Sequence, residues 1–211
     1  MDWLKILLIL GAGYALGNFS AGILISNRLA HIDIRDHGSK STGATNIFRV
    51  LGAKASVLTL LGDALKSALA ALIGLWLLGP IGSYIGGVAA ILGHLWPVAY
   101  GFKGGKGVAS ALGVALVVNP AVALVMLAAA LAMIFAIRVV SIASLCIMLV
   151  YSGYFLLFHW GDWPLCLYAL LLTSLVFVAH RSNLRRIADG SEWKNRLDFS
   201  KAFRRKKRNL K

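Results

Sequence analysis

The chain has 211 residues and a formal net charge of +14, although only 14% of its residues are charged. When Gly is counted as apolar and Tyr is not, roughly two thirds of the residues are apolar, compared with about 45–50% in an average soluble domain. This composition excludes a disordered chain, a disulfide scaffold and an ordinary cytosolic enzyme. A membrane and a nucleic acid both remain as partners for the basic charge, so its position along the chain must decide between them.

Seven apolar segments follow one another along the chain, and a membrane-spanning helix needs about 20 such residues. They are residues 6–26, 55–78, 81–102, 108–118, 121–137, 139–158 and 164–179. We interpret the first as a retained span, because no clear signal-peptide cleavage site accompanies it. Asn119 and Pro120 interrupt the uncharged run of residues 107–137. The sequence therefore predicts a short or broken helix near residues 108–118, which is tolerable only where protein covers its end.

The positive charge indicates how these segments are oriented. Twenty of the 22 Lys and Arg residues lie in four clusters: residues 28–54, Lys103 with Lys106, Arg138, and residues 181–211. Seven spans place all four clusters on one side of the membrane, whereas six spans separate the last cluster from the first. The positive-inside rule favours seven spans, with the N-terminus outside and the C-terminus in the cytoplasm.

The fold class predicted is therefore an all-α integral membrane protein with one membrane domain, residues 1–190. Residues 191–211 are predicted to form a basic cytoplasmic tail that binds anionic membrane lipid. The two cysteines, Cys146 and Cys166, lie in apolar runs and are expected to be core residues rather than a disulfide. No Cys/His cluster has zinc spacing, and we expect neither a metal nor a cofactor.

Four polar segments gather on the predicted cytoplasmic side: residues 38–49, 102–107, 138–144 and 180–186. They combine glycines, small hydroxyl residues and cations. Backbone N–H groups in such loops bind phosphate, especially where a helix begins, and Lys or Arg neutralises its charge. The spacing around Lys106 is not that of an ATP-binding P-loop. A phosphate site is favoured over a plain glycine turn because two such loops lie on the same side.

Other polar residues leave alternatives open. His180 and Asn183 are three residues apart and would share a helical face. Asp63 and Lys66 have the spacing of an ion pair inside a span, which we interpret as locking helices together. His31 and Asp36 match the spacing of a catalytic dyad in soluble glycerolipid acyltransferases, but the other features of that family are missing. His94 is expected to be structural.

Several motifs carry a resemblance to one family. They are IDIR (32–35), GS (38–39), GATNIFRVLG (43–52), DALK (63–66), LGH (92–94), FKGGKGVA (102–109), HRSNL (180–184) and GSE (190–192). Over roughly residues 8–195, the chain resembles the bacterial membrane acyl-phosphate:glycerol-3-phosphate acyltransferases, the PlsY family. One departure lies at Lys40-Ser41-Thr42, where the family usually reads Gly-Asn-Pro.

The resemblance implies seven transmembrane helices and an active site on the cytoplasmic side of the bacterial inner membrane. It implies transfer of a fatty acyl group from acyl phosphate to the 1-hydroxyl of glycerol 3-phosphate, giving lysophosphatidic acid and phosphate. The catalytic residues implied are Ser39, Arg49, Lys106, His180 and Asn183. The substrate-binding residues implied are Gly38, Gly43, Thr45, Asn46, Lys103, Gly104, Gly105, Gly107 and Ser144. Glu192 would be more structural than catalytic.

Two other functions compete with this interpretation. A transporter of a phosphorylated metabolite would use the buried Asp63 and Lys66, but it predicts repeat symmetry that the sequence does not display. A nucleic-acid-binding protein would use the basic tail, and we expect no nucleic-acid partner. The sequence fixes no oligomeric state.

Overall fold

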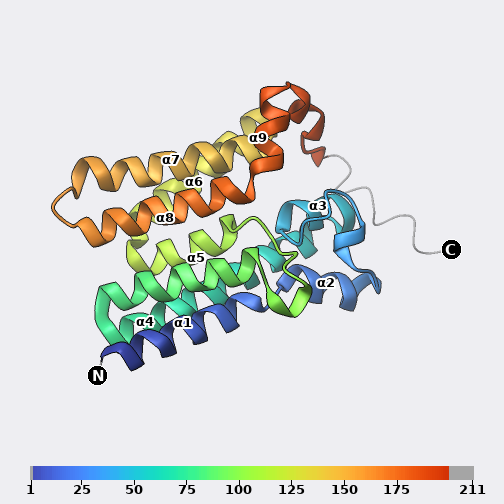
Figure 1. Ribbon diagram of the computed structural model, residues 1–211. Coiled ribbons are helices and arrows are strands. Elements are labelled where there is room, and N and C mark those ends of the chain that lie inside the picture. The colour runs from blue at the N-terminus through green and yellow to red at the C-terminus, as the bar shows by residue number, and fades with distance from the viewer. Residues whose placement is uncertain (1, 200–211) are drawn as a thin grey trace.

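The computed structural model describes residues 2–199, and within them it is helical without strands. Figure 1 shows the long helices lying side by side, with short helices gathered at the end opposite the N-terminus. The elements are α1 (Asp2–Asn18), α2 (Ala21–Ala30), η1 (Ile34–Asp36), α3 (Ala44–Leu51), α4 (Ala53–Leu95), η2 (Val98–Tyr100), α5 (Val108–Val118), α6 (Pro120–Ile137), α7 (Val140–Phe158), α8 (Trp163–Ala179), α9 (Arg181–Ala188) and η3 (Ser191–Asn195).

Four helical stretches are long and apolar enough to cross a membrane. They cover residues 2–30, 53–100, 120–137 and 140–158, and α8 with the bent α9 makes a fifth. The first predicted segment is split, because Ser20 begins a new helix by accepting a hydrogen bond from the Ile23 N–H. The integral membrane, all-helical class predicted from the sequence agrees with this architecture.

Helix α4 consists of two straight helical parts, called rods below, that meet at a break in the backbone. Leu78 and Gly79 have non-helical backbone angles, with a φ of 64° at Gly79, and Pro80 follows. The second rod folds back on the first, since Gly74 and Gly82 touch backbone to backbone. This break separates residues 55–78 from residues 81–102, as the sequence predicted, although the second rod ends at Leu95. Small residues let such rods approach closely.

Helix α5 is the short helix predicted before Asn119. The Asn119 side chain caps α6 by accepting from the Val122 N–H, and Pro120 occupies the first turn. Gly113 packs directly on the Ala64 backbone of α4, and much of α5 is buried. The protein cover that a short apolar helix requires is therefore present.

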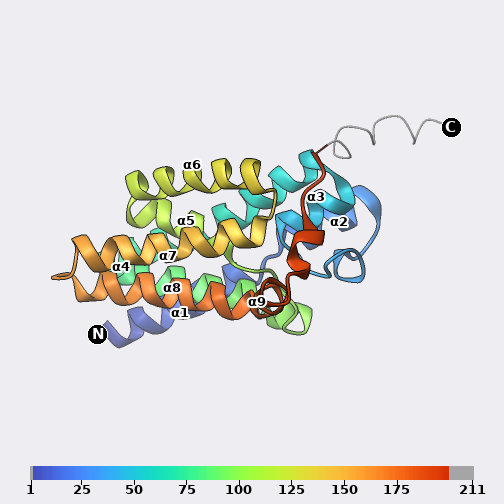
Figure 2. The same ribbon diagram turned by 90° about the horizontal axis from the view of Figure 1, so that it is seen from above.

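The polar end of the bundle is formed by α2, α3, α9 and η3, which both views place together (Figures 1 and 2). Residues 191–199, assigned from the sequence to a separate tail, pack against this end. Glu192 and Leu197 are buried, and the Leu197 N–H donates to the Arg138 carbonyl at 2.8 Å. The basic run of the predicted tail at residues 204–208 lies outside the described residues. Both cysteines are free thiols. Cys166 is buried, in agreement with its assignment to the core, whereas Cys146 is only half-buried.

Candidate active site

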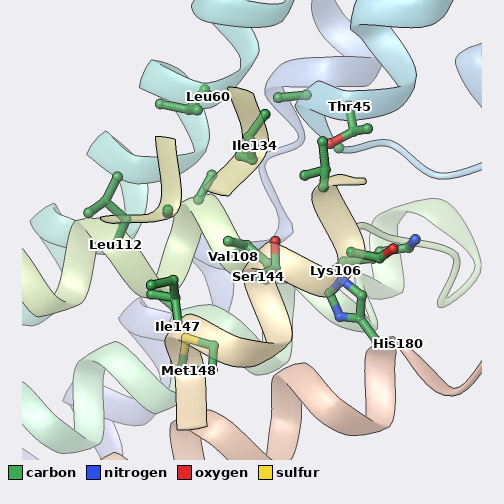
Figure 3. Close-up of a pocket in the computed structure, with 18 of the residues that line it drawn as sticks. Thr45, Leu60, Lys106, Val108, Leu112, Ile134, Ser144, Ile147, Met148 and His180 are labelled. Carbon is green, nitrogen blue, oxygen red and sulfur yellow. The ribbon is translucent and has the colours of Figure 1, made fainter. Parts of the chain in front are cut away.

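A cavity of about 420 Å³ opens among α3, α4, α5, α6, α7, the turn between α8 and α9, and η3. Its polar part is lined by side chains from six segments: residues 39–49, α4, the loop at Lys106, α7, residues 180–186 and η3. Its apolar part runs between α5, α6 and α7. Figure 3 shows Lys106, His180, Ser144 and Thr45 around the polar part and Leu112, Ile147 and Met148 farther in. One continuous space therefore joins charged groups to an apolar channel.

Asn46 organises the loop that precedes α3. Its side chain is 1% exposed. Its Oδ1 accepts from the Ser39 N–H at 2.9 Å, and its Nδ2 donates to the carbonyls of His37 and Ser41 at 3.0 and 2.9 Å. Gly38 has a φ of 59° and lies against the Asn46 amide. The loop is thereby folded so that Ser39 lines the cavity.

Lys106 and Asn183 form the closest polar contact between two of the predicted catalytic residues. Lys106 Nζ donates to Asn183 Oδ1 at 2.6 Å. Burial lowers the pKa of Lys106 to about 8; the negative charge of Glu192 opposes this shift, and the positive charges of Arg186 and Arg49 add to it. A buried ammonium group with two further cations nearby is stabilised by an anionic ligand.

Glu192 orients the Asn183 amide. Its Oε1 accepts from Asn183 Nδ2 and from Ser141 Oγ, both at 2.6 Å, and its Oε2 accepts from Arg186 Nε at 2.5 Å and Asn195 Nδ2 at 3.2 Å. Burial alone would raise the pKa of Glu192, but these hydrogen bonds lower it to about 2. A permanently ionised carboxylate thus connects η3 to α7 and α9.

His180 ends α8 and is 2% exposed. Its Nδ1 lies 2.8 Å from the Val176 carbonyl, which can only accept, so Nδ1 carries a proton. Burial and the neighbouring charge of Lys106 lower the pKa of His180 to about 4. The imidazole is therefore neutral at physiological pH, with Nε2 as an acceptor.

Arg49 lies on the last turn of α3 and lines the cavity. Its guanidinium donates to the Asn195 carbonyl at 3.0 Å. Arg49, Lys106 and Arg186 together supply three positive charges around one space. Two carboxyl groups also line it: Glu192, and Asp63, which is paired with Lys66. This balance suits ligands that carry phosphate.

The structure brings most of the predicted site residues to this cavity. Those that line it are Ser39, Gly43, Thr45, Asn46, Arg49, Lys106, Gly107, Ser144, His180 and Asn183. Four predicted residues, Gly38, Lys103, Gly104 and Gly105, do not line it. Lys103 is exposed, whereas Gly104 and Gly105 pack on His94.

Several polar lining residues were not proposed from the sequence: Ser41, Ser141, Ser182, Arg186 and Asn195. Helical spacing offers a signal for some of them. Arg186 follows Asn183 by three residues on α9, and Ser141 precedes Ser144 by three on α7. Asn195 carries no such signal, because its position depends on η3 packing near α3, where the Asn195 carbonyl accepts from Arg49.

His31 and Asp36, the alternative dyad, are both exposed and do not line the cavity. Asp63 and Lys66 form the predicted ion pair, with 3.3 Å between Oδ1 and Nζ. Among residues 2–199, no group of three or more His, Cys, Asp or Glu side chains is placed to hold a metal ion.

Comparison with known proteins gives a consistent result. A family model described as glycerol-3-phosphate acyltransferase matches residues 7–190. The glycerol-3-phosphate acyltransferase of Alkaliphilus metalliredigens (strain QYMF) is 37% identical over 188 residues, covering 89% of this chain and 95% of that protein. That of Geobacillus kaustophilus (strain HTA426) is 40% identical over 185 residues, covering 88% of this chain and 93% of that protein.

Solved structures match over nearly the whole chain. One is the glycerol 3-phosphate form of PlsY (YgiH), an integral membrane glycerol 3-phosphate acyltransferase. It aligns with a TM-score of 0.84 at 34% identity, covering 93% of this chain and 98% of that one. The lysophosphatidic acid form of PlsY aligns with a TM-score of 0.82 at 32% identity, covering 94% and 98%.

Proposed function

The chain belongs to the glycerol-3-phosphate acyltransferase family, and we propose that it uses acyl phosphate as its acyl donor. It is a multi-pass membrane enzyme that transfers a fatty acyl group to the 1-hydroxyl of glycerol 3-phosphate, giving lysophosphatidic acid. The family membership favours this function over the transporter considered from the sequence.

The observation that supports the proposed donor is that a single cavity has both a cationic part and an apolar part. Arg49, Lys106 and Arg186 surround its polar part, and an apolar channel between α5, α6 and α7 continues from it. Acyl phosphate carries a phosphate at the reacting end of a hydrocarbon chain, and glycerol 3-phosphate carries a second phosphate. Both anions find cations here, while the chain lies in the apolar part.

The reaction then needs positioning and charge stabilisation more than a nucleophilic side chain. The glycerol 1-hydroxyl oxygen attacks the acyl carbonyl carbon, and the bond from that carbon to the phosphate oxygen breaks. Phosphate leaves with the electron pair and takes the hydroxyl proton. Lys106 and Arg49 stabilise the negative charge that moves onto the leaving phosphate.

His180 and Asn183 contribute orientation in this scheme. A pKa of about 4 makes His180 too weak a base to hold the hydroxyl proton at neutral pH, but its Nε2 accepts a hydrogen bond from the hydroxyl. Asn183 fixes the Lys106 ammonium through the 2.6 Å contact. Ser39 and Ser144 offer hydroxyl donors to the phosphate oxygens.

The proposed topology is seven spans in the bacterial inner membrane, with the N-terminus outside and the site facing the cytoplasm. The backbone break at Leu78 and Gly79 supports it by dividing α4 into two rods. The connections at residues 79–80 and 159–163 contain no Lys or Arg, as outer loops require. Helix α3, which carries Arg49, and α9, which carries three arginines, lie at the other end (Figure 1).

The deciding experiment measures formation of lysophosphatidic acid by the purified protein in lipid, with glycerol 3-phosphate and either acyl phosphate or acyl-CoA as donor, and it follows phosphate release in the acyl phosphate reaction. We expect release with acyl phosphate and no acyl transfer from acyl-CoA. Lys106→Ala and Arg49→Ala should lose most activity while the protein still inserts into the membrane. Transfer from acyl-CoA alone would overturn the proposed donor, and near-wild-type turnover in either variant would overturn the assigned phosphate contacts.

A further inference from the structure

Three titratable side chains lie buried together inside the bundle, and the proposed reaction uses none of them, although two, Asp63 and His94, are part of the cavity wall. Asp63, Lys66 and His94 are 1%, 4% and 4% exposed. Lys66 Nζ lies 3.3 Å from Asp63 Oδ1 and 2.9 Å from His94 Nδ1. Buried charged groups in a membrane protein are costly, which makes a role for this cluster worth seeking.

Lys66 fixes the state of the His94 ring. Its ammonium also donates to the carbonyls of Gly17 at 2.9 Å and Phe19 at 2.5 Å, where α1 ends. An ammonium has three N–H donors and no acceptor. With two donors on carbonyls and the third on Nδ1, the proton of the neutral imidazole is on Nε2. Asp63 balances the charge, so the ring is held in one position and one tautomer.

The imidazole of His94 packs against the loop that carries Lys106. A Cβ atom at Gly105 would overlap His94 Nε2 and Cε1, and one at Gly104 would overlap the His94 carbonyl. The Gly105 N–H donates to that same carbonyl at 3.1 Å. The loop therefore contacts both the backbone and the ring of His94 one residue before Lys106.

We infer that His94 is a positioning residue for Lys106, with Lys66 and Asp63 holding the imidazole against Gly105. The inference rests on the proposed role of Lys106 in phosphate binding. It explains why two glycines precede Lys106 although neither lines the cavity: each allows close contact with His94. Displacing a binding group by about 1 Å can reduce turnover by two orders of magnitude, so such support matters for catalysis.

The test uses variants that alter this contact from either side. His94→Asn keeps an acceptor for Lys66 near the Nδ1 position and removes Nε2 and Cε1. Gly105→Ala places a methyl group against the intact ring. Each variant should lower kcat/KM by about 10-fold or more. Of the two substrates, each should raise the KM of the one whose KM is raised by Lys106→Gln. His159→Asn and Gly161→Ala, a histidine and an unobstructed loop glycine between α7 and α8, are the matched controls.

The double variant separates positioning from general destabilisation. In His94→Asn/Gly105→Ala the new methyl group enters the space that the ring leaves, so part of the activity lost in Gly105→Ala should return. Contact of this kind gives non-additive effects, whereas two independent losses of stability add. Additive losses, or wild-type constants in either single variant, would overturn the inference.

Further outcomes separate the inferred role of His94 from the proposed role of Lys106. If His94→Asn does not fold, Gly105→Ala carries the test alone, because it substitutes none of the three residues of the buried cluster, and wild-type constants there would overturn the inference. Wild-type constants in Lys106→Gln would overturn the proposed phosphate contact. Impairment of Lys106→Gln with unimpaired His94→Asn and Gly105→Ala would overturn only the role of His94.

Discussion

Asn183 can accept the 2.6 Å hydrogen bond from Lys106 because Glu192 takes its amide nitrogen, also at 2.6 Å. An amide presents a carbonyl oxygen and an NH₂ group, and the carboxylate determines which faces the ammonium. The orientation of a cationic site residue is thus decided by a group on η3, outside the membrane-spanning helices.

Glu192→Gln is expected to disturb this arrangement. The carboxylate accepts from Ser141, Asn183, Arg186 and Asn195, and a glutamine NH₂ group would face one pair of these donors. We expect kcat/KM to fall by about 10-fold or more, with a lower melting temperature, because buried donors lose their acceptor. The measurements are steady-state phosphate release and thermal unfolding in detergent. Asp189→Asn, at an exposed carboxyl group, is the control; equal effects in both variants would contradict the prediction.

Activity should decline as the pH rises through about 8. The pKa of Lys106 in the folded protein is lowered to about 8 by burial, so the ammonium and its attraction for phosphate are lost above that value. The decline should appear in kcat/KM, and Lys106→Arg should move it to higher pH because guanidinium stays charged. A profile of kcat/KM from pH 6 to 10 for both proteins checks this. If the alkaline decline of kcat/KM stayed at the same pH in Lys106→Arg, the titrating group would not be Lys106.

Substitution of Lys103 and of Lys106 should have very different effects on activity, although both lysines belong to the same glycine-rich loop. Lys103 is exposed and does not line the cavity, whereas Lys106 reaches Asn183. Lys103→Ala should keep kcat/KM within about twofold, while Lys106→Ala loses most activity. The two variants carry the same change in net charge, so each controls for the other. Equal losses would show that the loop acts through its total charge.

His31→Ala should likewise be mild, within about twofold of wild-type kcat/KM. His31 is exposed at the C-terminal end of α2 and does not line the cavity. The assay is the same phosphate release, with His180→Ala as the contrasting variant. A loss comparable to that of Lys106→Ala would restore the dyad of His31 and Asp36.

The helical segments followed from apolar length and from the break at Asn119-Pro120, because both are local properties of the chain. The cavity residues on α3 and α9 were accessible through motifs that resemble a family. Two features were not accessible. The role of Gly104 and Gly105 depends on contact with His94, and the position of Asn195 depends on η3 packing near α3, where its carbonyl accepts from Arg49. Such contacts join distant segments, and no periodicity or spacing in the sequence encodes them.

Lys40 offers a test of the loop that departs from the family pattern. Its φ is 58°, in the left-handed region that disfavours side chains with a Cβ atom, and its N–H donates to the His37 carbonyl at 3.0 Å. Lys40→Gly should keep this turn and relieve the strain, raising the free energy of unfolding by up to about 1 kcal/mol. Thermal or denaturant unfolding of the purified protein measures it. Lys103→Gly is the control, because Lys103 is exposed and is not among the residues with positive φ, so the same change there should not stabilise. Equal shifts in both variants would attribute the effect to lost charge, and destabilisation by Lys40→Gly would mean that contacts of the lysine outweigh its backbone strain.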